Sequence, residues 1–430
     1  MNATAFINVR LIDPETGLDE HSALLVKDGQ IADFGQGLFA DGVPEGIETI
    51  DGAGLVLTPA LVDMRVTLHE PGETQKETVQ TAADAAVSGG VTTLVALPGV
   101  DPVTDDIALV EFMIARGRET EKINVHPYGA VTMGAKGEKL TEMGLLTNAG
   151  AVAFTDGVRA IADPLTMRRA LAYASSFNLL IVQHPEEPNL AAGGQMNEGE
   201  IATRLGLQGI PGCAEVMMIE RDLHLVELTG GRYHVAHIST KKGIDAVRQA
   251  KARGLNVTCD TAPPYFGLNE LEIGEYRTFA KLSPPLRAED DRLAVVEGLR
   301  DGTIDVIASD HLPQDPDSKR LPFDQAEVGI TSVEALLPIA LELYHNQVLP
   351  LGGLLKTMTA NPANLLGLNA GHITKGAPAD IILIDPDMPW RIRESDIISK
   401  SKNTLFDGRP VQGRCIRTVH QGQTVYKFET

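Results

Sequence analysis

Four residues of the types that hold divalent metal ions each follow a short apolar run of this chain. Asp156 ends one run, and His184, His237 and Asp310 end three others. Imidazole nitrogens and carboxylate oxygens are ligands for zinc and similar divalent ions. If the runs are strands whose carboxyl ends meet, these four side chains converge on one rim. The pattern predicts a site of metal-assisted chemistry at that rim.

Each of these residues taken singly also has a plain structural interpretation. A lone histidine at a strand end is more often part of the packing than a metal ligand. Asp310, which directly precedes His311, could instead cap the next helix. The metal-site interpretation depends on the recurrence of such residues on four separate runs.

The elements that must position these residues follow an alternating pattern through the middle of the chain. Helical segments lie between the runs, and the segment at 77–90 ends on a glycine pair suited to a C-cap. Eight β-then-α units predict an α/β fold, a TIM-like (β/α)8 barrel with its active site at the carboxyl ends of the strands. An open doubly wound sheet is the alternative, but no glycine-rich fingerprint follows the first run. The eight runs are residues 57–68, 91–99, 123–132, 150–157, 178–187, 232–240, 256–264 and 303–311.

Both ends of the chain consist instead of short β-rich runs punctuated by Gly and Asp-Gly. These runs are residues 5–13, 22–29 and 30–35 at one end and residues 376–387, 410–422 and 423–430 at the other. The pattern predicts one small β domain built from both termini. We place this composite β domain at residues 1–55 plus 370–430 and the barrel at residues 56–369.

Charge and cysteine content exclude several classes of partner and compartment. Lys and Arg number 37 against 58 Asp and Glu, so the formal net charge is −21. Binding to nucleic acids or anionic membranes needs clustered cations on the protein surface, so neither is an expected partner. Cys213, Cys259 and Cys415 form no CxxC pair, which indicates a reducing compartment. No signal peptide or membrane-spanning run is apparent, and we expect a cytoplasmic protein.

From end to end the chain resembles the dihydroorotases, a family in the cyclic amidohydrolase branch of the amidohydrolase superfamily. The resemblance implies an amidohydrolase-type barrel, zinc, and hydrolysis of a cyclic amide in pyrimidine synthesis. The segments that carry it are LVDMRVTLHEPGETQKET, GGVTTLVALPG, GAVAFTDG, VQHPEE with MNEG, GLQGIPGCAE, YHVAHISTKKGID, SPPLRAEDDRLAVVEGLRDGTIDVIASDHLP and TANPANLLGL.

The chain departs from the pattern of active family members on the first strand. Those members carry a His-x-His pair that supplies two ligands to one metal, followed by an Arg that holds the substrate carboxylate. The matching positions here are Arg65, Thr67 and His69. The first-metal ligands are therefore replaced.

Three further family positions are also changed. The substrate-binding Asn after the second strand corresponds to Gly99, and the Asn before two prolines of the seventh loop corresponds to Ser283. Gln314 stands for the second His of the family's Asp-His-x-Pro-His segment. Most substrate-recognising groups are thus replaced together with the first-metal ligands.

The resemblance also assigns roles to the residues that the chain retains. Asp156, His184 and His237 match the ligands of the second metal, and Asp310 matches the general base. Two histidines and a carboxylate suffice for a single zinc with an open fourth position. We therefore expect one zinc ion at most, or none.

Arg65 argues against any retained metal. A guanidinium cannot deprotonate to become a ligand, and it brings a permanent positive charge to this position. By family position, Asp156 and Asp310 face the site where the family binds a divalent cation. A salt bridge from Arg65 to either carboxylate would therefore replace the metal's charge. We predict such a salt bridge.

These departures favour a non-catalytic homologue, a pseudoenzyme. The resemblance implies that such proteins act as structural partners of aspartate transcarbamoylase, the preceding enzyme of pyrimidine synthesis. The alternative is an active mononuclear-zinc dihydroorotase or related cyclic amidohydrolase, since Asp310 and the second-metal set remain. A third possibility is a homodimeric metabolic protein with an unrelated ligand in the old pocket. A homo-oligomer is expected in any case.

Overall fold

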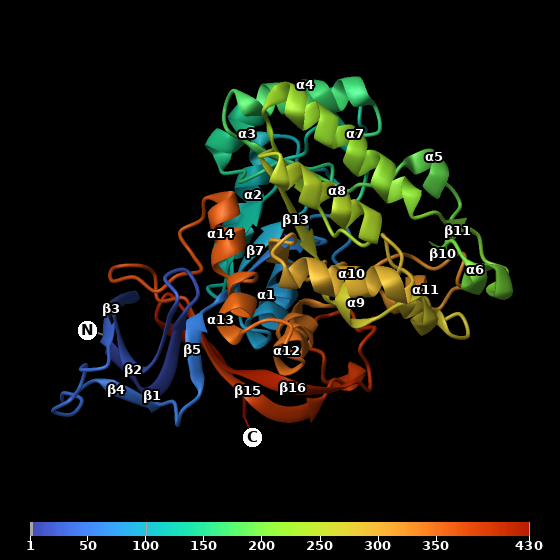
Figure 1. Ribbon diagram of the computed structural model, residues 1–430. Coiled ribbons are helices and arrows are strands. Elements are labelled where there is room, and N and C mark those ends of the chain that lie inside the picture. Colours follow the sequence, from blue (N-terminus) through green and yellow to red (C-terminus); the bar gives the residue numbers. More distant parts are fainter. Residues whose placement is uncertain (1–2, 100, 430) are drawn as a thin grey trace.

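Strands from both ends of the chain pair in one sheet. The computed structural model describes residues 3–99 and 101–429, so residues 1, 2 and 430 of the predicted β domain lie outside it. The sheet order is β17-β16-β15-β5-β1-β2-β3, with β4 beside β1. Figure 1 shows the N-terminal blue strands and the C-terminal red strands on the same side of the molecule. The prediction of a β domain from both termini is therefore confirmed.

The sheet strands have the following bounds: β1 Ala3–Asp13, β2 Leu18–Lys27, β3 Gln30–Gly35, β4 Glu48–Asp51, β5 Val56–Pro59, β15 Ile381–Arg391, β16 Pro410–His420 and β17 Gln423–Lys427. Within this set β5 pairs with β1 in parallel and with β15 in antiparallel register. It lies beyond the predicted limit at residue 55 and directly precedes the barrel. The division at 55 and 370 stays a prediction.

A closed ring of parallel strands forms the middle of the molecule. Phe154 supplies the fourth position of the ring through single bridges to Gly129 and Ile181. A bridge between Val66 and His311 joins the last strand to the first. The predicted (β/α)8 barrel is therefore confirmed, and the open doubly wound sheet is wrong. The regular barrel strands are β6 Leu61–Val66, β7 Val91–Ala96, β8 Asn124–Pro127, β9 Leu180–Gln183, β12 Arg232–Val235, β13 Val257–Thr261 and β14 Val306–Ile307.

Helices surround the ring of strands, and shorter helices lie within its longer connections (Figure 1). The helices of eight residues or more are α1 Val79–Ser88, α2 Ile107–Glu119, α4 Pro164–Ser175, α7 Cys213–Thr229, α8 Lys241–Ala252, α10 Glu289–Arg300 and α12 Leu336–His345. The shorter elements are α3 Met143–Ala149, α5 Pro188–Ala191, α6 Glu200–Leu205, α9 Pro263–Gly267, α11 Pro316–Lys319, α13 Leu351–Lys356, α14 Ala360–Leu366, β10 Met196–Asn197 and β11 Gly209–Ile210. None of the helices in the described ranges has the length and apolar character that a membrane crossing needs.

Local sequence accounts for the boundaries of α1. The Thr78 side chain accepts a hydrogen bond from the Thr81 backbone N–H, which satisfies an amide left free at the helix start. The helix ends at Ser88, and Gly90 follows with φ +84°. That left-handed conformation suits glycine, because a Cβ atom would be strained there.

The barrel interior has an apolar layer below its polar rim. Met64, Val95, Tyr128, Val182 and Val306 pack together inside the ring. Buried polar groups need hydrogen-bond partners, so an apolar layer leaves the carboxyl ends of the strands as the place for charged side chains. The functional site therefore lies above this layer.

Candidate functional site

Arg65 and Asp310 form a buried ion pair between the first and last barrel strands. The Nε atom of Arg65 donates to Oδ1 of Asp310 over 2.8 Å, and the arginine side chain is 2% exposed. The predicted salt bridge is thereby confirmed, with Asp310 as the partner. Because the two positions come together only when the barrel closes, this pair also links the first strand of the barrel to the last.

His237 completes a closed ring of hydrogen bonds with this pair. Its Nδ1 atom lies 3.0 Å from Oδ2 of Asp310, and its Nε2 atom lies 3.4 Å from Nη2 of Arg65. A carboxylate only accepts and a guanidinium only donates, so the network places the imidazole proton on Nδ1. His237 and Asp310 have φ values of 36° and 54°, uncommon for residues other than glycine and concentrated at functional sites.

The charges of this ring shift the pKa values of its members. Burial acts to raise the pKa of Asp310, but His237 and Arg65 outweigh it and hold that pKa below the usual aspartate range. Burial lowers the pKa of His237, and the Arg65 cation lowers it further. The ring therefore favours an ionised Asp310 and a neutral His237 at neutral pH.

His184 extends the ring on its other side. Its Nδ1 atom lies 2.7 Å from Nε2 of His237, so it donates to the same nitrogen that faces Arg65. Its own Nε2 atom lies 3.5 Å from Oγ of Ser283 and 3.7 Å from Oε1 of Glu186. Burial opposes ionisation of Glu186, but the contact with His184 lowers the pKa of that carboxyl overall.

Asp156 does not join this set. Its Oδ1 atom accepts from the Thr132 backbone N–H over 2.9 Å, and its Oδ2 atom accepts from the Thr132 hydroxyl. Burial raises the pKa of Asp156, and the bonds from Thr132 counteract part of that rise. The polar contacts recorded within residues 3–99 and 101–429 include none between Asp156 and either histidine. Asp156 is thus engaged with Thr132, and its place in one ligand set with His184 and His237 stays a prediction.

The arrangement does not fit a metal ion. A histidine binds metal through a nitrogen lone pair, and the Nε2 lone pair of His237 already faces donors from Arg65 and His184. The buried guanidinium brings a cation where a dication would need anionic ligands. In the described part of the chain no group of three His, Cys, Asp or Glu side chains is placed to hold an ion.

The remaining predicted residues lie around this centre in separate environments. His69 is buried, with Nε2 2.9 Å from the Pro313 carbonyl oxygen, so it holds a loop. Thr67 donates its backbone N–H to the His311 carbonyl, and Gln314 donates its amide to the Val328 carbonyl over 2.9 Å.

Gly99 and Ser283 lie close to the centre. A Cβ atom at Gly99 would meet no atom within 4 Å, so space is open there, and the Cα atom of Gly99 lies 3.5 Å from the Cβ position of Gly157. The Gly157 carbonyl in turn accepts from Nη2 of Arg65 over 3.4 Å.

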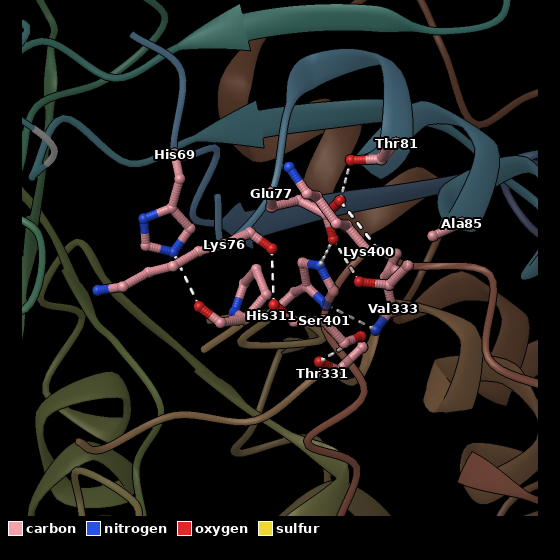
Figure 2. Close-up of polar contacts among 12 residues, drawn as sticks. His69, Lys76, Glu77, Thr81, Ala85, His311, Thr331, Val333, Lys400 and Ser401 are labelled. Carbon is pink, nitrogen blue, oxygen red and sulfur yellow. Dashed lines mark hydrogen bonds and ion pairs between the residues drawn. The ribbon is translucent and has the colours of Figure 1, made fainter. Parts of the chain in front are cut away.

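Glu77 forms a buried pair with His311, which follows Asp310 in the sequence, and Figure 2 shows the polar contacts around it. Glu77 lies 3.7 Å from Nε2 of His311, and neither side chain is exposed. The Nδ1 atom of His311 accepts from the backbone N–H groups of Ser332 and Val333. Sequence reasoning missed Glu77, because an acidic residue before a helix carries no signal of a distant partner.

The same carboxylate reaches the C-terminal part of the chain. Glu77 accepts from the hydroxyl of Ser399 and, over 3.2 Å, from the backbone N–H of Lys400. Burial acts to raise the pKa of Glu77, but His311 and the hydroxyl donors lower it overall. Glu77 thus fastens the segment after β15 to the residue that follows Asp310.

Comparisons with known proteins agree with this architecture. A family model described as "Dihydro-orotase-like" matches residues 54–243, and one described as "Amidohydrolase family" matches residues 297–426. The dihydroorotase of Wolbachia sp. subsp. Brugia malayi is 46% identical over 98% of this chain and 95% of its own length. That of Pelobacter propionicus is 45% identical over 98% of each chain.

Solved structures show the same fold. The L-hydantoinase of Arthrobacter aurescens superposes with a TM-score of 0.88 at 24% identity, over 99% of this chain and 96% of that one. The dihydropyrimidinase of Brevibacillus agri has a TM-score of 0.84 at 21% identity, over 99% and 95%. At these identities the likeness concerns the fold alone.

Proposed function

This chain belongs to the dihydroorotase family of amidohydrolases, and from that membership we propose that it is a pyrimidine-synthesis protein that no longer hydrolyses dihydroorotate. The observation that carries the proposal is the ion pair between Arg65 and Asp310. In the proposed state a guanidinium takes the position and the charge of the family's metal centre. The barrel is then kept as a scaffold.

The hydrogen bonds from Arg65 and His237 leave Asp310 poorly suited to act as a base. A general base works best when its pKa lies near the operating pH. Arg65 and His237 hold the pKa of Asp310 below its usual range, and both carboxylate oxygens already accept hydrogen bonds. Proton transfer to this carboxylate is therefore disfavoured.

The groups that would hold a substrate are also replaced in this proposal. By family position, His69, Gly99 and Ser283 stand where an arginine and two asparagines would bind dihydroorotate. His69 is turned to a backbone carbonyl, and Gly99 has no side chain to offer. Loss of such polar contacts at a reacting centre typically costs several kcal/mol of transition-state stabilisation.

An active dihydroorotase is the second candidate. The comparisons favour it, because relatives named dihydroorotase match at 45–46% identity over nearly their full length. The retained His184, His237 and Asp310 favour it as well. Activity would require Arg65 to leave its contacts with Asp310 and His237, and Asp156 to leave Thr132. The geometry of the centre therefore favours the first candidate.

Metal analysis combined with a ring-opening assay separates the two candidates. The purified chain is assayed with dihydroorotate, with and without added zinc, beside an active cyclic amidohydrolase as positive control. We expect the purified chain to retain less than one zinc ion per chain. We also expect it to show no turnover of dihydroorotate. A rate on the order of 1 per second or faster, typical of enzymes, would establish the second candidate.

The scaffold role implies a partner, and we propose aspartate transcarbamoylase. The net charge of −21 favours a basic surface on that partner, since opposite charges steer association. Assembly into a homo-oligomer and a cytoplasmic location belong to the same proposal.

A further inference from the structure

A narrow cleft lies between the C-terminal strands and the helices on one side of the barrel. Figure 1 shows α12 beside β15 and β16, the elements that enclose it. We call it the Trp390 cleft, after the one tryptophan of the chain. Its lining residues include Leu337, Pro338, Trp390, Ile392, Arg393 and Arg414.

Arg414 is held among aromatic rings in this cleft. Its guanidinium carbon lies 4.3 Å from the ring centre of Trp390 and 3.9 Å from that of Phe428. The indole itself is fixed, because its Nε1 atom donates to the Gly413 carbonyl over 2.9 Å. Rings take up the faces of a guanidinium, and its N–H donors lie in the plane between them. The donor edge of Arg414, which Tyr426 also contacts, is therefore the part that faces a bound anion.

Arg393 brings a second cation to the same cleft. Across residues 3–99 and 101–429, no carboxylate lies within salt-bridge distance of Arg393 or Arg414. In a chain of net charge −21, carboxylates are abundant, and other arginines such as Arg409 are paired. Arg393 and Arg414 are thus two cations of the cleft that no carboxylate of the described residues pairs.

The acidic groups of the cleft are engaged elsewhere. Glu334 accepts from the backbone N–H groups of Ile398 and Ser399, over 3.0 and 2.9 Å, and burial raises its pKa. Asp396 accepts from the Ser395 hydroxyl over 2.9 Å. Both oxygens of Glu334 and Oδ1 of Asp396 thus accept hydrogen bonds from within the protein.

Most of the remaining wall is apolar. Leu337, Pro338 and Ile392 are buried beside the cleft, and Ile398 is exposed at its edge. A narrow apolar slot with an aromatic wall accommodates a flat ring, and cations at its edge add selectivity for a negative substituent.

We propose that the Trp390 cleft binds a small planar aromatic carboxylate, with its ring against Trp390 and the apolar wall and its carboxylate on Arg414 and Arg393. This site is separate from the barrel rim, so it goes beyond the function proposed above. Its occupancy is independent of whether the rim is catalytic.

The fluorescence of Trp390 reports on the cleft directly, because no other tryptophan contributes. Benzoate is titrated into the full chain, with benzamide as a planar neutral probe and cyclohexanecarboxylate as a non-planar anion. We expect benzoate to change the emission with a Kd on the order of 1 mM, a fitting value for so small a ligand. The other two probes should bind about tenfold more weakly.

Variants locate the site. Arg414→Gln and Arg393→Gln should each weaken benzoate binding by roughly tenfold, because each removes a charge-assisted contact. Arg393 is exposed, so its replacement keeps the test valid if Arg414→Gln perturbs folding. Arg417→Gln, on β16 but outside the cleft, is the matched control and should bind as the parent does.

Two outcomes would overturn the proposal. One is no emission change with benzoate on the order of 10 mM, well above the expected Kd. The other is an equal response from the parent and both cleft variants, which would place benzoate elsewhere. A ring-opening activity at the barrel rim would leave either result unchanged, so the two proposals fail separately.

Discussion

Arg65 donates from Nε to Oδ1 of Asp310 over 2.8 Å, across the seam where the first and last barrel strands meet. The contact places a permanent cation inside a rim of histidines and carboxylates. It satisfies the Asp310 charge and, through Nη2, approaches His237. One side chain thereby supplies the positive charge that this rim requires.

Removing this cation should destabilise the protein. Arg65→Ala leaves Asp310 without its charged partner, and breaking a buried pair typically costs about 3–5 kcal/mol. We expect the lower end, roughly 3 kcal/mol, because Asp310 keeps 16% of its side chain exposed. Urea unfolding measures the change. The control is Arg10→Ala, whose pair with Asp19 is exposed and should contribute about 1 kcal/mol or less. Equal losses in the two variants would contradict the role given to Arg65.

Restoring imidazoles on the first strand should restore metal binding. The double variant Arg65→His with Thr67→His removes the cation and adds two neutral nitrogen ligands beside His184 and His237. Calorimetry should show zinc affinity at least about tenfold above that of the parent. Thr67→His alone keeps Arg65 and is the matched control. Tight stoichiometric zinc binding by the parent would refute the hypothesis that Arg65 replaces the charge of the metal.

Folding stability should fall as the solution is acidified below about pH 6.5, the ordinary pKa of histidine. Burial, with Lys76 nearby, lowers the pKa of His69 to about 4. The unfolded chain therefore binds a proton that the folded chain does not, and stability decreases as pH falls from 6.5 toward 4. The slope from one such group is at most about 1.4 kcal/mol per pH unit.

The variant His69→Asn should flatten this dependence in urea unfolding measured across the same range. His21→Asn, at an exposed histidine, is the control. A His69→Asn protein whose unfolding free energy changes with pH as steeply as that of the parent would rule out His69 as the source.

Association with aspartate transcarbamoylase should be electrostatic. We expect the two proteins to co-purify at low salt and micromolar concentration, and the complex to weaken as salt screens the charges. Analytical ultracentrifugation at several salt concentrations measures this. Failure to associate at low salt would count against the scaffold role.

Much of the architecture followed from sequence alone. Eight apolar runs alternating with helical segments specified a barrel, because strands and helices have distinct periods and a parallel ring needs helical crossovers. Residues that end such runs, including His184, His237 and Asp310, had to reach one rim. Charge balance at the positions matched to the family's metal site predicted a salt bridge from Arg65 to Asp310 or Asp156, and the structure selects Asp310.

Only the tertiary structure decided how the other polar groups are used. Asp156 follows Phe154, the bridged residue at the fourth position of the ring, yet its carboxylate bonds Thr132, a residue of the preceding loop. Glu77 meets His311 from a position 234 residues away in sequence, which no local pattern reveals. The order of strands and helices follows from short-range sequence periodicity. The rotamer of a buried side chain depends instead on hydrogen-bond donors from distant segments, which become neighbours only after folding.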